Sequence, residues 1–233
     1  MKLSLSPLPE GLDRAPSNDN ACVYDPAHRV VDMRHTAPAK IPRSKVVGGR
    51  TVMRDPSTVT GIVLHQMGVE LGVGPYRLRQ AGGDPELAQM LRARDIPAHA
   101  STLIEGWVVA PHPLAAYLWH ANGLNATTLG LEVEGLYDGR KGPRRPSLET
   151  RMATRRALRW LVEQGRAEGM PLRWLWAHRQ SSKKRRADPG AALWEVAVNE
   201  AYSLGLETRP TDTVGDGRPI PVEWDPAHGV GRY

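Results

Sequence analysis

The sequence predicts an α/β fold in which a mixed central β-sheet is flanked by helices. Short runs of β-branched and apolar residues, typical of buried strands, alternate with segments that carry helix-capping residues and an apolar stripe. The expected order is strand, helix, hairpin, strand, helix, strand, helix, and such an order gives a mixed sheet with helices on its faces. Two of the expected strands end in a histidine, which indicates a site at one edge of the sheet.

The first strand is expected over residues 58–66 (TVTGIVLHQ), with His65 at its end. This continuous apolar run suits a central strand that is covered on both faces. A helix should follow over residues 84–96, because Asp84 is a typical N-cap and a proline occupies the first helical position. Residues 99–111 predict a hairpin, since two apolar runs flank a Glu-Gly turn.

Residues 128–135 (TLGLEVEG) predict the next strand. We expect its two acids, Glu132 and Glu134, to point to opposite sides, so that only one of them faces the histidines. A long helix is expected over residues 147–168, with Ser147 as its N-cap. The apolar stripe of this helix is expected to consist of Leu148, Met152, Ala157, Leu158, Leu161 and Val162.

Residues 174–177 (WLWA) predict a short buried strand with His178 at its end, and residues 191–204 predict the last helix. The basic loop between them leads to Asp188. Ligands commonly collect beyond the carboxyl ends of strands, where His65 would bring a second imidazole to the same point. A catalytic zinc needs three such protein ligands and one open position. The alternative is a surface histidine and a helix-capping aspartate.

Length and composition predict one globular domain with extensions, or at most two small domains. The chain has 233 residues, of which 40% are hydrophobic and 24% charged, as in ordinary soluble proteins. Residues 1–45 contain many prolines and polar residues, so we expect an irregular N-terminal arm. Residues 46–206 would form the catalytic domain and residues 207–233 a C-terminal extension. The single cysteine, Cys22, excludes an internal disulfide bond.

The net charge of +6 favours an anionic partner, such as nucleic acid, an acidic cell-wall polymer or a membrane surface. Charge alone does not choose among these three. The sequence contains no apolar run long enough for a membrane span, and its N-terminus lacks the apolar core of a signal peptide. We therefore expect synthesis in the cytoplasm without export by the general secretory route.

Five segments occur in the order found in a known family: VLHQ (63–66), AHASTLIEG (98–106), WHANG (119–123), LGLEVEG (129–135) and AHRQSSKKRRADPG (177–190). Together they resemble the type-2 zinc-dependent N-acetylmuramoyl-L-alanine amidases, which share a fold with peptidoglycan recognition proteins. The likeness covers residues 58–195. It implies an amidase-like fold and a hydrolase that cleaves the amide bond between N-acetylmuramic acid and L-alanine of the peptidoglycan stem peptide.

The resemblance also implies roles for individual residues. The family's zinc ligands fall on His65, His178 and Asp188, so Zn²⁺ is the implied cofactor. The catalytic glutamate falls on Glu132. Arg186 stands where the family commonly has a lysine that stabilises the oxyanion, and because arginine is a planar fork this exchange is not neutral.

The alternative cation for the oxyanion is Lys184, and the basic run at 183–185 would meet carboxylates of the stem peptide. We expect four residues on the substrate side of the site: His99, His120, Asn122 and Lys184.

Several functional alternatives stay open at this point. The hydrolase could act on cell-wall peptidoglycan, as a phage endolysin or a bacterial lytic enzyme, or it could recycle soluble muropeptides in the cytoplasm. The basic charge favours the anionic wall polymer. A non-catalytic peptidoglycan-binding module is disfavoured by the complete ligand set. Nucleic-acid binding has no motif to support it. We expect a monomer whose partner is peptidoglycan or a muropeptide, with no nucleic acid bound.

Overall fold

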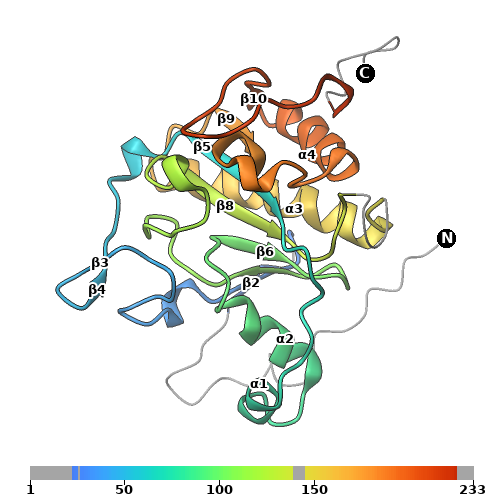
Figure 1. The fold of residues 1–233 in the computed structure, drawn as a ribbon. Helices are drawn as coiled ribbons and strands as arrows, with labels where there is room; N and C mark the ends of the chain where they lie inside the picture. The colour runs from blue at the N-terminus through green and yellow to red at the C-terminus, as the bar shows by residue number, and fades with distance from the viewer. Residues whose placement is uncertain (1–22, 26, 139–144, 225–233) are drawn as a thin grey trace.

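A mixed β-sheet forms the centre of the protein, as the sequence predicts. The structure is a computed structural model that describes residues 23–25, 27–138 and 145–224. The sheet has eight strands in the order β1-β2-β7-β6-β8-β5-β9-β10 (Figure 1). Its strands are β1 (Val23–Asp25), β2 (Val30–Asp32), β5 (Gly61–Gln66), β6 (Ala100–Thr102), β7 (Val108–Ala110), β8 (Thr128–Val133), β9 (Trp174–Ala177) and β10 (Glu207–Thr208). A separate hairpin pairs β3 (Val46–Val47) with β4 (Arg50–Thr51).

The direction of the strands brings the carboxyl ends of β5, β8 and β9 together at one end of the sheet. Strands β6, β8, β5, β9 and β10 run parallel, whereas β7 and β2 run antiparallel to them. The antiparallel pairing of β6 with β7 confirms the predicted hairpin. In the register of the parallel strands, His65 of β5 lies opposite Glu132 of β8, and Leu64 lies opposite Ala177 of β9. The ends of β5, β8 and β9 are therefore neighbours.

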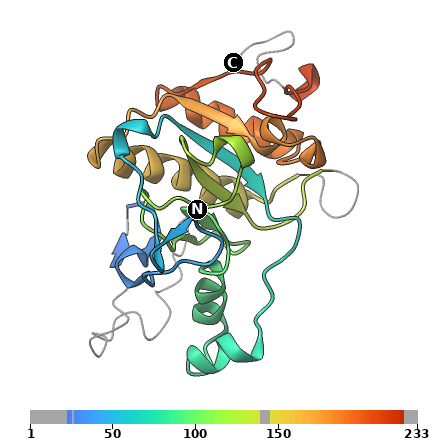
Figure 2. The same cartoon turned by 60° about the vertical axis from the view of Figure 1, so that its left-hand side comes forward.

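Helices cover the sheet on both faces. Helices α3 (Leu148–Ala167) and α4 (Ala191–Ser203) pack side by side on one face. Helices α1 (Pro75–Gln80) and α2 (Pro85–Ala93) form a lobe that projects from the lower end of the molecule (Figure 2). Within the described residues, no helix is both long and apolar enough to cross a bilayer.

The two capping residues act as predicted. The Asp84 carboxylate accepts hydrogen bonds from the backbone N–H groups at the start of α2, and the Ser147 hydroxyl accepts one from Thr150 at the start of α3. The predicted stripe of α3 is wrong at its first turn, where Leu148 is 55% and Met152 42% exposed. These two residues lie on the face of the helix that also carries the exposed Arg155 and Arg159, whereas Thr150 and Ala153 beside them are buried. The buried stripe includes Ala153, Ala157, Leu158, Trp160, Leu161 and Val162.

The prediction of an irregular arm over residues 1–45 is wrong for part of that segment. Strands β1 and β2 add to the edge of the sheet beside β7, and Val30 and Val31 are fully buried. Each of these strands has three residues, which is too short for a periodic pattern. The predicted domain limits stay a prediction. Cys22, residues 139–144 and the tail beyond residue 224 lie outside the described residues.

Alternation along the strands separates an apolar face from the face that carries the site. On β5, Ile62 and Leu64 join the large cluster under α3 and α4, whereas Val63 packs on the opposite face. His65 is two positions after Val63 and therefore shares its face. By the same alternation, Leu131 faces the helices and Glu132 faces the other way.

The segment after α4 returns to the loop between β9 and α4. The Gln180 side chain, which has no exposed surface, donates to the carbonyl oxygens of Arg209 at 2.7 Å and Asp212 at 2.9 Å. The Gln180 backbone oxygen accepts from Val214 N at 2.8 Å. Gly217 passes so close to this carbonyl that a Cβ atom would not fit there. These contacts hold the C-terminal segment 209–218 against the loop between β9 and α4.

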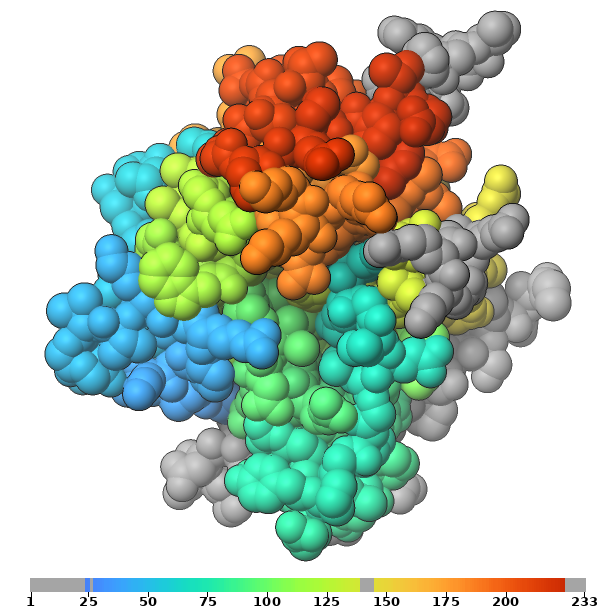
Figure 3. Space-filling view, in the orientation of Figure 1, coloured from blue at the N-terminus to red at the C-terminus, as the bar shows by residue number. Residues whose placement is uncertain are grey.

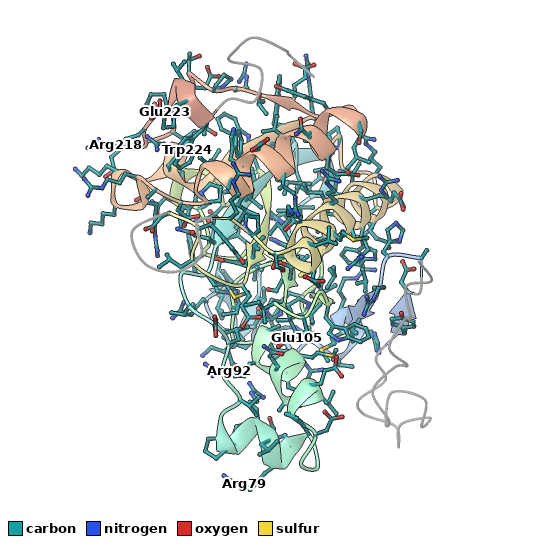
Figure 4. The ribbon with its side chains drawn as sticks, turned by 90° about the vertical axis from the view of Figure 1, so that its right-hand side faces the viewer. Arg79, Arg92, Glu105, Arg218, Glu223 and Trp224 are labelled. Atoms are coloured by element: carbon teal, nitrogen blue, oxygen red, sulfur yellow. The ribbon has the colours of Figure 1, made fainter. Side chains whose placement is uncertain are left out.

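The two opposite ends of the molecule carry different elements and side chains. At one end, Arg218, Glu223 and Trp224 lie together beside α4 (Figure 4). Trp224 also packs under the guanidinium group of Arg179, 4.8 Å from its ring centre. Arg79 belongs to the lobe at the opposite end. The predicted site lies between these ends.

Candidate metal centre and catalytic site

Three side chains that could hold a metal ion meet at the edge of the sheet. His65 is the penultimate residue of β5, His178 directly follows β9, and Asp188 comes from the end of the loop after β9. Their nitrogen and oxygen atoms all lie within 4.8 Å of one another, and all three residues are buried. The two Nδ1 atoms are 2.8 Å apart, and His178 Nδ1 is 3.0 Å from Asp188 Oδ2. The structure therefore brings together the three residues predicted as ligands.

Backbone contacts aim these side chains at one point. The other oxygen of the Asp188 carboxylate accepts a hydrogen bond from Gln66 N at 2.9 Å, which leaves Oδ2 toward the histidines. His178 begins a 3-10 turn (His178–Ser181) directly after β9. The Gln180 side chain accepts a hydrogen bond from Ala177 N at 2.9 Å and so closes this turn. Both ends of the loop are held by the sheet.

Burial keeps the histidine at the centre of this group neutral. The pKa of His65 is well below its usual value, chiefly because the ring is buried and secondly because of the neighbouring His178 and His120. A neutral imidazole has a free ring nitrogen for a metal ion. Two nitrogens and one carboxylate oxygen form a donor set that suits a zinc ion with an open position. The residues present therefore fit such an ion.

Glu132 lies beside the three predicted ligands and is the acid that faces them. Its Oε1 is 3.8 Å from His65 Nδ1, and its Oε2 is a buried atom without a hydrogen-bond partner among the described residues. Burial, and then the nearby charge of Asp188, raise the pKa of Glu132 to about 8. A cation and a water molecule in the site would provide the partners that this carboxylate lacks.

Glu134 lies away from the cluster, but not because side chains alternate along the strand. Positions two apart in a strand share a face, so alternation would place Glu134 with Glu132. Strand β8 ends at Val133, and the chain turns at this point. The Glu134 carboxylate accepts from the backbone N–H groups of Leu71 and Ile104, the latter at 2.8 Å. The predicted opposite placement is correct, and the physical reason is the end of the strand.

A cavity of about 590 Å³ opens next to the three predicted ligands. The loop after β9 borders it, and Figure 3 shows this loop (orange) between the segment around η3 (Asn122–Leu124, yellow-green) and the C-terminal segment (red). The residues that line the cavity are Trp119, His120, Asn122, Asn125, His178, Ser182, Lys184, Arg185 and Asp216. Of the residues predicted on the substrate side, His120, Asn122 and Lys184 therefore reach this cavity.

Arg185, and not Arg186, is the arginine that faces the site. Arg185 and Lys184 line both the large cavity and a smaller one of about 140 Å³ beside Asp188, whereas Arg186 lines neither. The positive charge of Arg185 also lowers the pKa values of Glu132 and His65. The prediction for Arg186 rests on its spacing from Asp188, but the 3-10 turn over Lys183–Arg185 rotates the preceding residue toward the site.

The prediction of His99 as a substrate-side residue does not agree with its place in the structure. His99 has no exposed surface. Its Nδ1 accepts from Gly130 N at 2.8 Å, and its Nε2 lies 3.0 Å from the carbonyl oxygen of Ala116. The buried guanidinium group of Arg54 lies beside it. His99 therefore belongs to the core below the site.

Four residues of the cavity were not predicted from the sequence, namely Trp119, Asn125, Ser182 and Asp216. Trp119 is 49% exposed and offers an aromatic surface at the rim of the cavity. Its signal in the sequence was its place next to His120 in a turn-forming segment. Asp216 comes from the C-terminal segment and pairs with Lys183 at 3.6 Å. No sequence pattern connects residue 216 with this site.

The site contains a buried group of two histidines and one carboxylate, and beside it a glutamate whose Oε2 has no hydrogen-bond partner in the described part of the chain. Such an arrangement is typical of a metal-dependent hydrolase. A sequence model of the N-acetylmuramoyl-L-alanine amidase family matches residues 55–191, which is more than half of the chain. The chain belongs to this family, and the predicted family resemblance is confirmed. The matched region contains β5, β8 and β9 and all four residues of the group.

Similar solved structures include amidases and peptidoglycan recognition proteins. The endolysin N-acetylmuramoyl-L-alanine amidase LysCS of Clostridium intestinale URNW is 17% identical, with 73% of this chain and 100% of that chain covered and a TM-score of 0.45. Drosophila peptidoglycan recognition protein SD is 22% identical, with 70% of this chain and 89% of that chain covered and a TM-score of 0.45. Drosophila PGRP-LB is 16% identical, with 76% of this chain and 95% of that chain covered and a TM-score of 0.47. No curated protein matches the sequence.

Proposed function

We propose that this protein is a zinc-dependent N-acetylmuramoyl-L-alanine amidase that hydrolyses the bond between N-acetylmuramic acid and L-alanine in peptidoglycan. Membership of the family supports the amidase activity. The observation that carries the zinc assignment is the convergence of His65, His178 and Asp188 within 4.8 Å, with Glu132 next to them. His65, His178 and Asp188 would hold the ion. When bound, zinc would activate a water molecule and polarise the scissile carbonyl group.

Glu132 is proposed as the general base. It would accept a proton from the attacking water while the oxygen of that water forms a bond to the amide carbon. The same carboxyl group would then give the proton to the amide nitrogen as the carbon–nitrogen bond breaks, which releases L-alanine with a free amino group. Burial raises the pKa of Glu132 in the metal-free protein, and a bound cation would lower it toward the neutral range, in which a carboxyl group can both take up and release a proton.

The cations of the loop after β9 would serve the negative charges of the substrate. The charge of Arg185 acts on both Glu132 and His65, so Arg185 is our preferred candidate for holding the developing oxyanion. Lys184 lines the same cavity and would bind carboxylates of the stem peptide. Arg186 keeps the family spacing, and a comparison of single variants decides between Arg185 and Arg186.

The substrate is proposed to be polymeric cell wall, as for an endolysin or another lytic enzyme. The protein carries a net charge of +6, and the exposed basic residues Lys184 and Arg185 line the cavity. A positively charged surface favours association with an anionic polymer. A soluble muropeptide is the second candidate, because a cavity of about 590 Å³ is large enough for a small glycopeptide.

The test combines metal content with product identity. Protein purified without chelators should contain about one zinc per chain by plasma emission, and it should release peptides with a new N-terminal alanine from purified sacculi. A chelator should stop the release and added zinc should restore it. His65→Ala and Asp188→Ala should lose both zinc and activity. Metal-free protein with full activity, or cleavage at another bond, would overturn the proposal.

A parallel assay distinguishes the two substrates. Sacculi and a purified soluble muropeptide are offered at equal concentrations of the scissile bond, and the specificity constants are compared. A higher kcat/KM on sacculi that falls with added salt supports the wall polymer, because salt screens the attraction between the basic loop and an anionic polymer. A higher kcat/KM on the muropeptide supports the recycling function.

A further inference from the structure

We propose that His120 is a positioning residue that fixes the ring of His65 for metal binding. It was predicted on the substrate side, and one edge of it does reach the cavity, but the residue is only 7% exposed. Both of its ring nitrogens have partners inside the protein. The inference rests on the proposed function, since it needs His65 to be a metal ligand.

The hydrogen bonds around His120 determine which nitrogens carry hydrogen. His120 Nε2 lies 3.4 Å from the carbonyl oxygen of Thr128. A carbonyl oxygen can only accept, so His120 Nε2 must be the donor and its Nδ1 must be the acceptor. That Nδ1 lies 3.1 Å from His65 Nε2, which is therefore the donor of the next bond.

This direction of hydrogen bonding leaves His65 with a free nitrogen on the side of the site. With its hydrogen on Nε2, the neutral His65 ring has a lone pair on Nδ1. His65 Nδ1 is the atom that faces His178, 2.8 Å from that ring's Nδ1. The chain from Thr128 through His120 thus selects the form of His65 that can bind a cation. Metal-binding histidines generally donate their second N–H in this way.

The surrounding residues hold the His120 ring in place. The Asn125 side-chain oxygen accepts from the backbone N–H groups of His120 at 2.8 Å and Ala121 at 2.6 Å. On β8, Gly130 lies against the ring, and a Cβ atom at this position would lie 2.9 Å from His120 Nδ1. The ring of His99 packs edge-on from behind, with 5.7 Å between ring centres. Gly130 therefore provides the space in which His120 can reach His65.

The experiment measures zinc affinity directly, by competition with a chromophoric chelator. His120→Leu removes the acceptor for His65, and we expect its zinc affinity to fall by about 10- to 100-fold. His120→Asn places a side-chain oxygen close to the position of Nδ1 and should recover part of the affinity. His112→Gln is the control, because His112 is buried elsewhere and bonds to the carbonyl oxygen of Ile96. This control should bind zinc like the wild type.

A second readout separates positioning from general damage to the fold. The visible spectrum of the cobalt-loaded protein reports the geometry of the ligands, and it should change in His120→Leu and return toward wild type in His120→Asn. Should His120→Leu fail to fold, Gly130→Ala tests the same bond, because its methyl group would press on His120 Nδ1. We expect weaker zinc binding in this variant as well.

The outcomes are distinguishable from those of the proposed function. Wild-type protein that binds no zinc contradicts the proposed function itself. Wild-type protein that binds zinc, together with unchanged affinity in His120→Leu or, where that variant is unfolded, in Gly130→Ala, overturns the role of His120 alone. Equal losses in His120→Leu and His120→Asn, with no recovery of the cobalt spectrum, would reduce His120 to a packing residue and overturn the inference too.

Discussion

Glu132 and Glu134 are two positions apart on the same segment, yet their surroundings are opposite. Glu132 lies beside three predicted metal ligands, and one of its carboxylate oxygens is buried without a hydrogen-bond partner among the residues that the structure describes. Glu134 has the same chemistry but accepts hydrogen bonds from the backbone of Leu71 and Ile104 and from the Gln89 side chain. Burial raises the pKa of both acids, while hydrogen bonds oppose the rise only for Glu134.

The difference shows how one short segment serves both chemistry and structure. The carboxylate of Glu134 accepts hydrogen bonds from three chain segments and so connects them. These segments are the loop before α1, helix α2 and the turn between β6 and β7. All of its hydrogen-bonding capacity is used by the protein, so none is left for a substrate. Glu132 keeps its capacity free, which a general base requires. Site-directed variants can test each half of this comparison.

The largest effect is expected from Glu132→Gln. Removing a general base typically lowers the rate by about 10²- to 10⁴-fold. The variant should keep its zinc, because the amide lies where the carboxylate was and the three proposed ligands are untouched. Amide cleavage is followed by mass spectrometry of peptides released from sacculi, and zinc by plasma emission. Wild-type cleavage rates in this variant would remove Glu132 from the mechanism.

Glu134→Ala should affect stability instead of chemistry. It leaves the backbone N–H groups of Leu71 and Ile104 without their acceptor, and such losses cost about 1–3 kcal/mol each when the groups are buried. We expect the free energy of unfolding in urea to fall by about 2–4 kcal/mol. The folded fraction should cleave substrate at nearly the wild-type rate. Glu134→Gln keeps one acceptor oxygen and should lose less stability; a large loss of kcat with normal stability would contradict the comparison.

Single variants of Arg185 and Arg186 should show a smaller effect on the rate, and this effect tells which of the two arginines acts in catalysis. Arg185→Ala should lower kcat by about tenfold, in line with the loss of one partly exposed charge contact in the transition state. It should also move the acidic limb of the pH–rate profile to higher pH, because Arg185 lowers the pKa of Glu132. Arg186→Ala is the matched control and should change neither. The reverse result would restore the prediction made from the family spacing.

The smallest effect concerns the stability of the metal-free protein above neutral pH. Burial raises the pKa of Glu132 from 4.5 to about 8, so the folded protein holds a proton that the unfolded chain has lost. The contribution of Glu132 is present below pH 4.5 and is lost as the pH rises to about 8. The buried His112 and His120, whose pKa values fall to about 4 and about 3 from 6.5, act in the opposite direction, but only below pH 6.5.

The interval between about pH 6.5 and pH 8 therefore isolates Glu132 from these histidines. Urea unfolding with excess chelator should show wild-type stability falling across this interval, by at most about 1.4 kcal/mol per pH unit. Glu132→Gln should show a flatter dependence, while Glu134→Gln should follow the wild type. Parallel curves for the wild type and Glu132→Gln would mean that the Glu132 carboxyl group titrates normally.

Much of the sheet could be predicted because its central strands are long and apolar. The strands that carry His65 and Glu132 and the strand that precedes His178 were all expected, and their parallel pairing places their carboxyl ends together. The two-residue and three-residue strands at the edges were not predictable, because so few residues show no periodicity. Helix α1 was also missed, since its six residues include no buried one and form no apolar stripe.

The site was predictable where a residue's role depends on position in a strand, and less so in loops. Arg185 and Arg186 could not be separated by spacing, because the 3-10 turn before Asp188 sets their directions. His99 and His120 look alike in sequence, each next to an alanine and a turn. Only the packing of the ring of His99 against Arg54 and Gly130 places it in the core. Asp216 reaches the cavity through long-range contacts that leave no local pattern.

The hydrogen bonds between Gln180 and the C-terminal segment limit how far the chain can be truncated. The family match ends at residue 191, yet the buried amide of Gln180 bonds to the carbonyl oxygens of Arg209 and Asp212. Gln180 is two residues from His178. A recombinant fragment trimmed to the family limits would deprive this amide of both acceptors and expose it to competing water. Expression plasmids for crystallography or for a smaller antibacterial agent should therefore retain the chain through residue 220.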